Sequence, residues 1–271
     1  MELILASGAC DFVNEVICAP AEVNELFEFR VPIWTIGGFP ITRTVVLILA
    51  IALIASAFLW FGLRKRSVIP SKFQAMTESA IGFVRDGIAI DIIGPEGVRY
   101  VPWLLSVFLF VLVGNLYEVT PGVNFPVTSR MALPAMLAAV TWVVFVIAGI
   151  KRQGLRYFLG IVWPTSVPVA LRPLVGLIEF FSILVIRPLT LAVRLFANMV
   201  AGHLMLTLLL VSGWVFISNV GEIGAKAGIG IAWFIMGLGI FVFEIVVITL
   251  QAYIFTLLSA VYVQTSLYPD H

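Results

Sequence analysis

The amino-acid sequence predicts an all-α, polytopic membrane protein, and three observations lead to this fold class. Hydrophobic residues make up 61% of the 271-residue chain and charged residues only 11%, whereas charged residues are about a quarter of an ordinary soluble domain. Several apolar stretches reach or exceed the roughly 20 residues that a helix needs to cross a bilayer. Short polar connections separate them, which favours helices over the alternating strands of a membrane barrel.

The first 42 residues are predicted to form an extracytoplasmic N-terminal segment, not a domain. They are acidic, contain three prolines and carry Gly37-Gly38 as a turn signal. Cys10 and Cys18 lie here; a disulfide and two free thiols are both open, and no metal site is expected because no histidine is close by. No basic leader with a cleavage site precedes the first apolar stretch, so we expect no cleaved targeting segment and a bacterial plasma membrane.

Residues 43–271 are predicted to form a single membrane domain, which begins with three ordinary spans at 44–62, 100–119 and 131–150. The first span stops at Arg64-Lys65-Arg66. A basic cluster marks the cytoplasmic side of a membrane, which leaves the N-terminus outside.

Between the first two spans, residues 71–90 have a different pattern. Apolar side chains recur there at near-helical spacing among charged ones. Ser71 is a suitable N-cap, and Gly94-Pro95 follows as a stop signal. We therefore expect an amphipathic helix on the cytoplasmic surface of the membrane, not a further span.

The chain ends with two apolar runs, 172–218 and 228–264, each too long for one perpendicular span. A helix of more than 40 residues would measure about 65 Å, twice the hydrocarbon thickness. The first run could break into two spans near Arg187-Pro188, or form one long tilted helix. If each run crosses once, ten basic residues lie inside, four outside and two in the membrane, which obeys the positive-inside rule. We expect a hairpin of two long tilted membrane helices and a cytoplasmic C-terminus.

Polar side chains interrupt the first long run, and Arg194 is the most costly of them. An arginine stays charged, and placing it in a bilayer costs from about 3 to more than about 10 kcal/mol. Thr190, Arg194 and Asn198 are spaced by four and share a helix face, whereas His203 lies about half a turn around the helix from Arg194. We interpret this as a functional constellation; an arginine that snorkels or pairs with a structural carboxylate is the alternative.

The second long run carries Glu244 and Gln251, seven residues apart on one face. If the runs are antiparallel with Gln251 level with Arg194, the numbers of level residues add up to 445, and Glu244 falls close to His203. This register predicts two pairs, Arg194 with Gln251 and His203 with Glu244. Histidine and glutamate both change protonation state, and such intramembrane pairs are typical of proton relays; a packed histidine and a neutral structural acid are the alternatives.

Three stretches of the chain stand out as motifs: Arg194-Leu-Phe-Ala-Asn198-Met-Val-Ala-Gly202-His203, Ile248-Thr-Leu-Gln251-Ala-Tyr-Ile-Phe255 and Asn115-Leu-Tyr-Glu118-Val-Thr-Pro121. All three resemble the a subunit of F-type ATP synthases. The resemblance extends over essentially the whole chain after the N-terminal segment. It implies a stator protein whose two long helices pack against a rotating ring of c subunits, with b-type peripheral stalk subunits and other ATP synthase subunits as further partners.

The resemblance also implies roles for individual residues. Arg194 matches the family's indispensable arginine, which faces the proton-carrying carboxylates of the ring and separates two aqueous half-channels. The residues that match polar positions of the proton path are Thr190, Asn198, His203, Glu244 and Gln251. A proton would pass Glu118, His203 and Glu244 to a ring carboxylate, and the charge of Arg194 would favour the ionised form of a returning carboxyl group.

The sequence departs from the family pattern at two places. Some members carry the acid where His203 stands and the histidine where Glu244 stands, so the pair is exchanged here. Glu179, a candidate for the inner half-channel, lies eight residues before Arg187, one more than the family spacing. A polar residue at the cytoplasmic interface is the alternative for Glu179, and a structural helix-end role is the alternative for Arg187.

No glycine-rich phosphate loop occurs in the sequence, so we expect a non-catalytic subunit with no cofactor and no nucleic acid as partner. Protons and the lipid bilayer are its expected partners besides the other subunits, and no extra carboxylate cluster favours sodium. A stand-alone ion-coupled transporter or channel is the alternative function, and a non-conducting membrane scaffold is a third.

Overall fold

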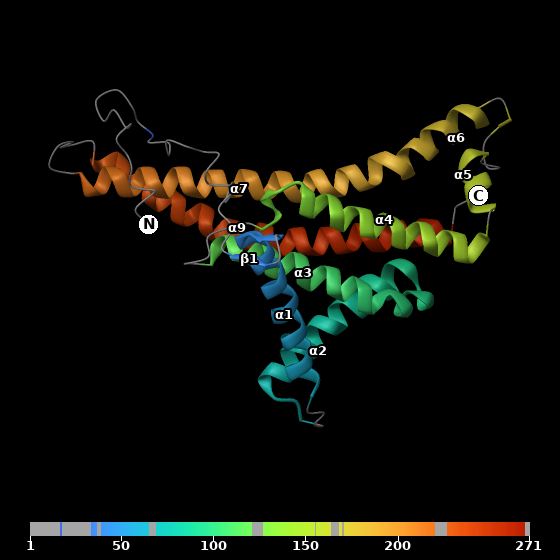
Figure 1. Ribbon diagram of the computed structural model, residues 1–271, viewed down its shortest axis with the longest axis horizontal. Coiled ribbons are helices and arrows are strands. Elements are labelled where there is room, and N and C mark those ends of the chain that lie inside the picture. The colour runs from blue at the N-terminus through green and yellow to red at the C-terminus, as the bar shows by residue number, and fades with distance from the viewer. Residues whose placement is uncertain are drawn as a thin grey trace. The chain divides into compact units, whose positions relative to one another are not determined.

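The computed structural model describes residues 17, 34–36, 39–64, 69–120, 127–154, 156–163, 168–169, 171–219 and 227–268. The helices and strands in chain order are β1 (Trp34–Ile36), β2 (Phe39–Ile41), α1 (Arg43–Leu63), α2 (Lys72–Val84), η3 (Arg85–Ile93), η4 (Pro95–Tyr100), α3 (Val101–Val119), η5 (Val127–Ser129), α4 (Ala132–Gln153), α5 (Arg156–Val162), α6 (Arg172–Phe181), η6 (Ser182–Ile186), α7 (Arg187–Ser218) and α9 (Ala227–Leu267) (Figure 1). Among the described residues, five helical segments are long and apolar enough to cross a membrane. The predicted all-α polytopic fold is confirmed.

The described part of the N-terminal segment includes a small β-hairpin that we did not predict. Its strands are antiparallel, with Trp34 opposite Ile41 and Ile36 opposite Phe39. Aromatic and β-branched residues dominate both strands, as is usual for strands. The predicted turn at Gly37-Gly38 and both cysteines lie outside the described residues.

The three ordinary spans correspond to α1, α3 and α4, and the observed bounds lie within one residue of the predicted ones except at the end of α4. α3 is preceded by the 3₁₀ segment η4. α4 continues three residues beyond the predicted end and keeps Lys151 and Arg152 in its last turn, where positive charges interact favourably with the helix dipole. Gly154 then stops it with a φ of 66°, a conformation that glycine adopts without strain.

The predicted amphipathic helix is α2, which continues as the π-helical segment η3. Ser71 is its N-cap, and the Ser71 side chain accepts a hydrogen bond from the Gln74 backbone N–H at 3.3 Å. The segment ends at Gly94, with a φ of 89°. Exposed apolar side chains line one face of it: Phe73, Met76, Phe83 and Ile90. Such a face suits a helix at a membrane surface, and the surface location stays a prediction.

The chain divides into two compact units that share the helices α1, α3, α7 and α9. The first unit comprises Met1–Leu49, Gly114–Ser129 and Ala197–Thr249. The second comprises Ala50–Val113, Arg130–Phe196 and Leu250–His271.

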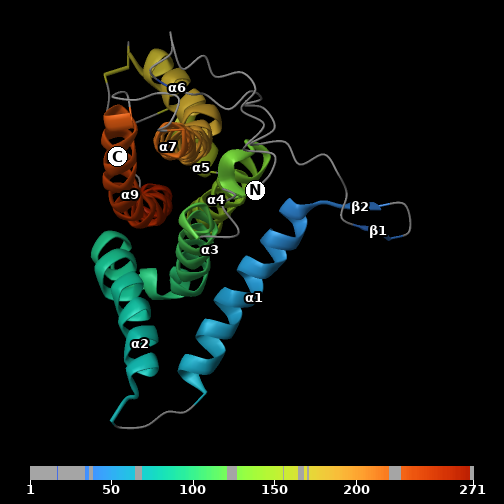
Figure 2. The same ribbon diagram turned by 90° about the vertical axis from the view of Figure 1, so that its left-hand side faces the viewer.

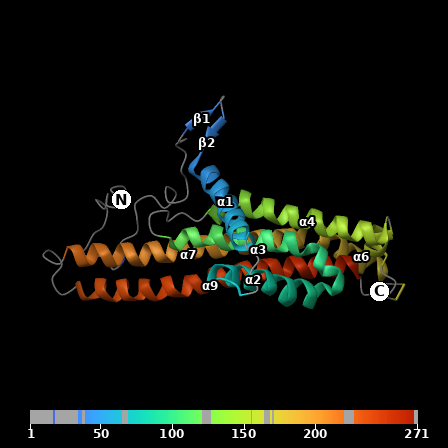
Figure 3. The ribbon, with the colours of Figure 1, turned by 90° about the horizontal axis from the view of Figure 1, so that it is seen from below.

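In the first unit, the later part of α7 and the first part of α9 lie side by side as an antiparallel hairpin (Figures 1 and 3). A Cβ atom on Gly213 would lie 2.9 Å from the Cβ of Phe234, and one on Gly230 would collide with Phe216. Glycines thus allow the two helices to approach closely, as small residues do between membrane helices. The numbers of these paired residues add up to 447 and 446, within two of the predicted register.

The second unit has its own apolar core, built from α3, α4 and the last part of α9. The rings of Phe145 and Tyr262 pack at 5.8 Å. The short helix α5 lies between the predicted span 131–150 and the long run 172–218. It packs through Tyr157, which is buried beside Gly149 and whose hydroxyl lies 3.3 Å from the Ser266 hydroxyl. Also in this unit, α1 and α2 converge (Figure 2) where Gly62 contacts Thr77.

The run 172–218 is one continuous helix, so the alternative of a break near Pro188 is wrong. The π-helical segment η6 joins α6 to α7 immediately before that proline. In a π-helix each N–H bonds the carbonyl five residues back, which for residue 188 is Ile183, and proline has no N–H to offer. The Trp142 indole N–H of α4 donates to the Ile183 carbonyl at 3.1 Å instead. The helix therefore continues through Pro188 without an orphaned carbonyl there.

Candidate functional site

A buried group of titratable side chains lies in the first unit, where α3, α7 and α9 supply one residue each. Glu118, His203 and Glu244 are 1%, 3% and 4% exposed. The Nδ1 atom of His203 lies 3.9 Å from Oε1 of Glu118. The structure thus brings the predicted residue Glu118 directly to the histidine.

Glu244 approaches α7 at Gly202, where the absence of a side chain leaves room for its carboxyl group. Its carboxyl group occupies the space beside Gly202 that a Cβ atom would fill, and the carboxyl carbon would lie 2.6 Å from that atom. The residue numbers 202 and 244 fit the register of the hairpin. The role of Gly202 was not predicted, and the only signal in the sequence is a glycine inside a helix directly before His203. The direct pairing of His203 with Glu244 stays a prediction, and the described contact of the histidine is with Glu118.

The C-terminal end of α3 is fixed by a hydrogen bond close to Glu118. The Thr128 hydroxyl of η5 donates to Oδ1 of Asn115 at 3.0 Å. Both side chains are buried, at 0% and 1% exposure, so this bond forms in a water-poor environment where it is costly to lose. It holds η5 against the helix that carries Glu118.

The second unit carries Arg194, and its environment is the opposite of that of His203. Arg194 and Thr190 are exposed, whereas Leu191 and Leu195 on the other face of α7 are 1% and 0% exposed. Asn198, one turn further along α7, is also exposed. These three residues are spaced by four on the continuous helix α7 and are all exposed, as the predicted common face requires.

Arg194 has no hydrogen bond or ion pair with any other described residue. The predicted contact with Gln251 is therefore absent, although Gln251 is 3% exposed on α9. The two side chains do not meet because Arg194 lies on the exposed face of α7, whereas Gln251 lies on the packed face of α9. The guanidinium of Arg194 therefore has no counter-charge among the described residues of this chain.

Glu179 and Arg187 lie on either side of the π segment η6. A π-helical turn contains one residue more than an α-helical turn, so eight residues across η6 present nearly the same face as seven in an α-helix. This accounts for the extra residue in the spacing. Glu179 is half-buried, and Arg187 donates from Nη1 to the Thr265 hydroxyl at 3.1 Å and lies over the ring of Tyr262.

No group of His, Cys, Asp and Glu side chains suited to a metal ion occurs in the part of the chain that the structure describes. The fold and these residues together define a multi-pass helical membrane protein with ionisable groups inside its membrane helices, a class in which such groups commonly mark paths for ions or protons.

The comparisons with known proteins narrow this class to one family. The family described as ATP synthase A chain matches residues 44–264. ATP synthase subunit a of Frankia alni is 40% identical over 92% of this chain and 89% of its own length. The proteins of the same name from Streptomyces lividans and Pseudarthrobacter chlorophenolicus are 39% and 36% identical over 93% of this chain, and over 89% and 94% of their own lengths. The chain belongs to the ATP synthase subunit a family.

This membership confirms the resemblance that the sequence showed. The protein is a component of the membrane sector of an ATP synthase, and other subunits of that synthase are its partners. Membership in this family argues against the alternative of a stand-alone transporter.

Proposed function

We propose that the chain is the proton-translocating stator subunit of a rotary F-type ATP synthase and is itself non-catalytic. In this role it provides two aqueous half-channels and presents Arg194 to the carboxylates of a c-subunit ring, while b-type peripheral stalk subunits hold it in place. The observation that carries the proposal is the exposed position of Arg194, without an acidic partner among the described residues. A buried arginine with its own carboxylate would be a structural ion pair; an exposed one at membrane depth needs a carboxylate from another protein.

The outer half-channel would end at the buried group of Glu118, His203 and Glu244. All three side chains can gain and lose a proton, and the 3.9 Å separation of His203 from Glu118 is close enough for transfer through a small shift or one water. Gly202 leaves room for the carboxyl group of Glu244 between the helices of the hairpin. Asn198 and Thr190 would line the face of α7 towards the ring, and Gln251 would support that face from α9.

The inner half-channel would pass Glu179. The π segment turns this half-buried carboxyl group towards the same side of the helix as Arg187. Arg187 itself is held by Thr265 and Tyr262, which favours a structural role for it near the end of the path.

The driving force would be electrostatic. A neutral ring carboxyl group can enter lipid, and the fixed positive charge of Arg194 favours its ionised form on return, so it releases its proton to the inner side. Each charge that crosses contributes about 2.3 kcal/mol per 100 mV. The protein would lie in a bacterial plasma membrane with its N-terminus outside and its C-terminus in the cytoplasm, and it would carry protons rather than sodium ions.

The test is Arg194→Ala in the assembled synthase, with ATP-driven proton pumping and ATP hydrolysis measured in inverted membrane vesicles. We expect pumping to fall to background while hydrolysis by the complex continues. Arg156→Ala, which removes an exposed arginine outside the five candidate spans, should pump normally. Coupled pumping by the Arg194→Ala complex would overturn the proposal.

A further inference from the structure

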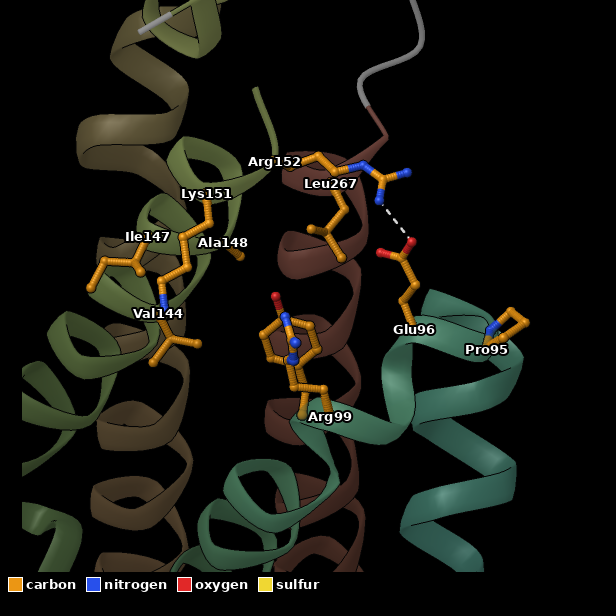
Figure 4. A pocket seen from close by; sticks show the side chains of 10 residues that line it. Pro95, Glu96, Arg99, Val144, Ile147, Ala148, Lys151, Arg152 and Leu267 are labelled. Atoms are coloured by element: carbon orange, nitrogen blue, oxygen red, sulfur yellow. Dashed lines mark hydrogen bonds and ion pairs between the residues drawn. The ribbon is translucent and has the colours of Figure 1, made fainter. Parts of the chain in front are cut away.

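A pocket of about 840 Å³ lies in the second unit, and no residue of the proposed proton path is among those that line it. It is formed by η4, the last turns of α4 and the end of α9 (Figure 4). The residues that line it are Pro95, Glu96, Arg99, Tyr100, Val144, Ile147, Ala148, Lys151, Arg152 and Leu267. Its size is in the usual range for small-molecule sites.

The charges at this pocket do not cancel. Arg152 donates from Nη1 to Oε1 of Glu96 at 2.7 Å, so the single carboxylate of the lining is already neutralised. Arg99 and Lys151 remain, and neither makes an ion pair or a hydrogen bond with another described residue. The pocket therefore carries two uncompensated positive charges, which suits a ligand with a phosphate group.

The same pocket is lined by apolar side chains and adjoins an exposed helix surface. Val144, Ile147 and Leu267 are among these apolar side chains. Ile147 belongs to a stripe of exposed apolar side chains that follows α4 at helical spacing: Met136, Val140, Val143, Ile147 and Ile150. A ligand that fits both features has an anionic head and a long hydrocarbon tail.

We propose that this pocket binds the phosphate headgroup of an anionic membrane phospholipid, with one acyl chain lying along the exposed stripe of α4. Arg99 and Lys151 would hold the phosphate, and the Arg152–Glu96 pair would close one edge of the site. Lys151 and Arg152 lie in the last turn of α4, where a membrane helix leaves the hydrocarbon and meets the headgroups. The lipid would fill the space between η4 and α4.

The test uses the whole ATP synthase in phosphatidylcholine nanodiscs that contain a small fraction of a photoactivatable lipid. One sample holds phosphatidylglycerol with a diazirine in its acyl chain, and the other holds the matching phosphatidylcholine. After illumination, mass spectrometry locates the labelled residues. We expect the anionic probe to label the 143–150 segment of α4 about tenfold more than the neutral one, since each basic side chain near the headgroups contributes to the attraction.

Two variants and one competitor sharpen the result. Arg99→Gln with Lys151→Gln should reduce anionic labelling to the neutral level, whereas Lys72→Gln with Arg85→Gln removes the same charge from α2 and η3 and should leave it unchanged. Arg85 already bonds Asp86 at 2.8 Å and lowers the pKa of that carboxyl group, so it is not a free site. Inorganic phosphate in the buffer should not displace the lipid.

Three outcomes would overturn the proposal. They are equal labelling by both probes, loss of labelling at low concentrations of inorganic phosphate, and cross-linking of the α4 stripe to a neighbouring subunit instead of lipid. The contrast between the two probes in the unsubstituted complex tests the proposal even where the double variant does not assemble.

Discussion

At the scale of single residues, α7 carries charged and titratable groups in two different environments. His203 is 3% exposed and lies beside Glu118 in the first unit. Arg194 is exposed in the second unit and makes no ion pair there among the described residues. A histidine is readily neutral inside a protein, whereas an arginine is not. The helix therefore buries the group that can lose its charge and exposes the one that cannot.

Gly202→Ala should impair proton translocation without unfolding the hairpin. The new methyl group would occupy the place of the Glu244 carboxyl group and push it away from its present position. A misplacement of about 1 Å can reduce a reaction rate about 100-fold, so we expect pumping to fall about 10- to 100-fold. The measurement is ATP-driven acidification of vesicles at equal amounts of assembled complex.

The matched control for this change is Gly239→Ala. It makes the same substitution in α9, where the added Cβ would have no atom within 4 Å, and pumping should be unchanged. If both variants pump as well as the unsubstituted complex, the position of the Glu244 carboxyl group does not matter for the path.

At the scale of elements, the two π segments are the features that the sequence predicts least. The spans could be predicted from length and apolar composition, because a helix needs about 20 apolar residues to cross a bilayer. The start of α2 could be predicted from Ser71, its N-cap. The π segment η6 depends on Pro188 and on Trp142, which lies 41 residues from Ile183 in the chain. A contact between residues so far apart in the chain produces no periodic pattern in the sequence, so it could not be predicted.

In the candidate site, too, the sequence predicted what depends on spacing within one helix and not what depends on contacts between helices. The spacing of Thr190, Arg194 and Asn198 predicted their common face because a helix repeats every 3.6 residues. The family resemblance predicted Glu118 as a residue of the proton path, but it did not predict that Glu118 lies directly beside His203. The role of Gly202 was not predicted, because the space that it leaves for the Glu244 carboxyl group exists only where α9 packs against α7.

Trp142→Phe should weaken the helix around η6. Phenylalanine keeps most of the ring but cannot donate to the Ile183 carbonyl, and an unsatisfied buried acceptor costs about 1 to 3 kcal/mol. We expect backbone amides of residues 183–190 to exchange with deuterium about tenfold faster in the assembled complex. Trp60→Phe, at a side chain that is 68% exposed, is the control. Unchanged exchange in the Trp142 variant would mean that the indole does not stabilise the π segment.

At the scale of the whole molecule, the α7–α9 hairpin is where the proposed stator and a transporter would behave differently. A stator keeps the register of its helices while the ring turns past it. A transporter that alternates access moves one group of helices against another. The close contacts at Gly213, Gly230 and Gly237 leave no room for sliding, because each glycine fits against a particular side chain of the opposite helix.

A cross-link can test this difference directly. A Cβ atom on Gly237 would lie 3.4 Å from the Cβ of Leu209, close to the separation in a disulfide. Leu209→Cys with Gly237→Cys, in a chain with Cys10 and Cys18 replaced by serine, should therefore cross-link on mild oxidation. Leu209→Cys with Gly239→Cys places the second thiol about half a turn away on α9 and should not.

The functional consequence follows from the same geometry. If the hairpin is a rigid part of the stator, the oxidised complex should pump protons as fast as the reduced one, because no movement between α7 and α9 is needed when the ring carries the protons. If pumping stops on oxidation and returns on reduction, the hairpin itself must open during transport. That result would favour alternating access within this chain over a fixed arginine facing a moving carboxylate.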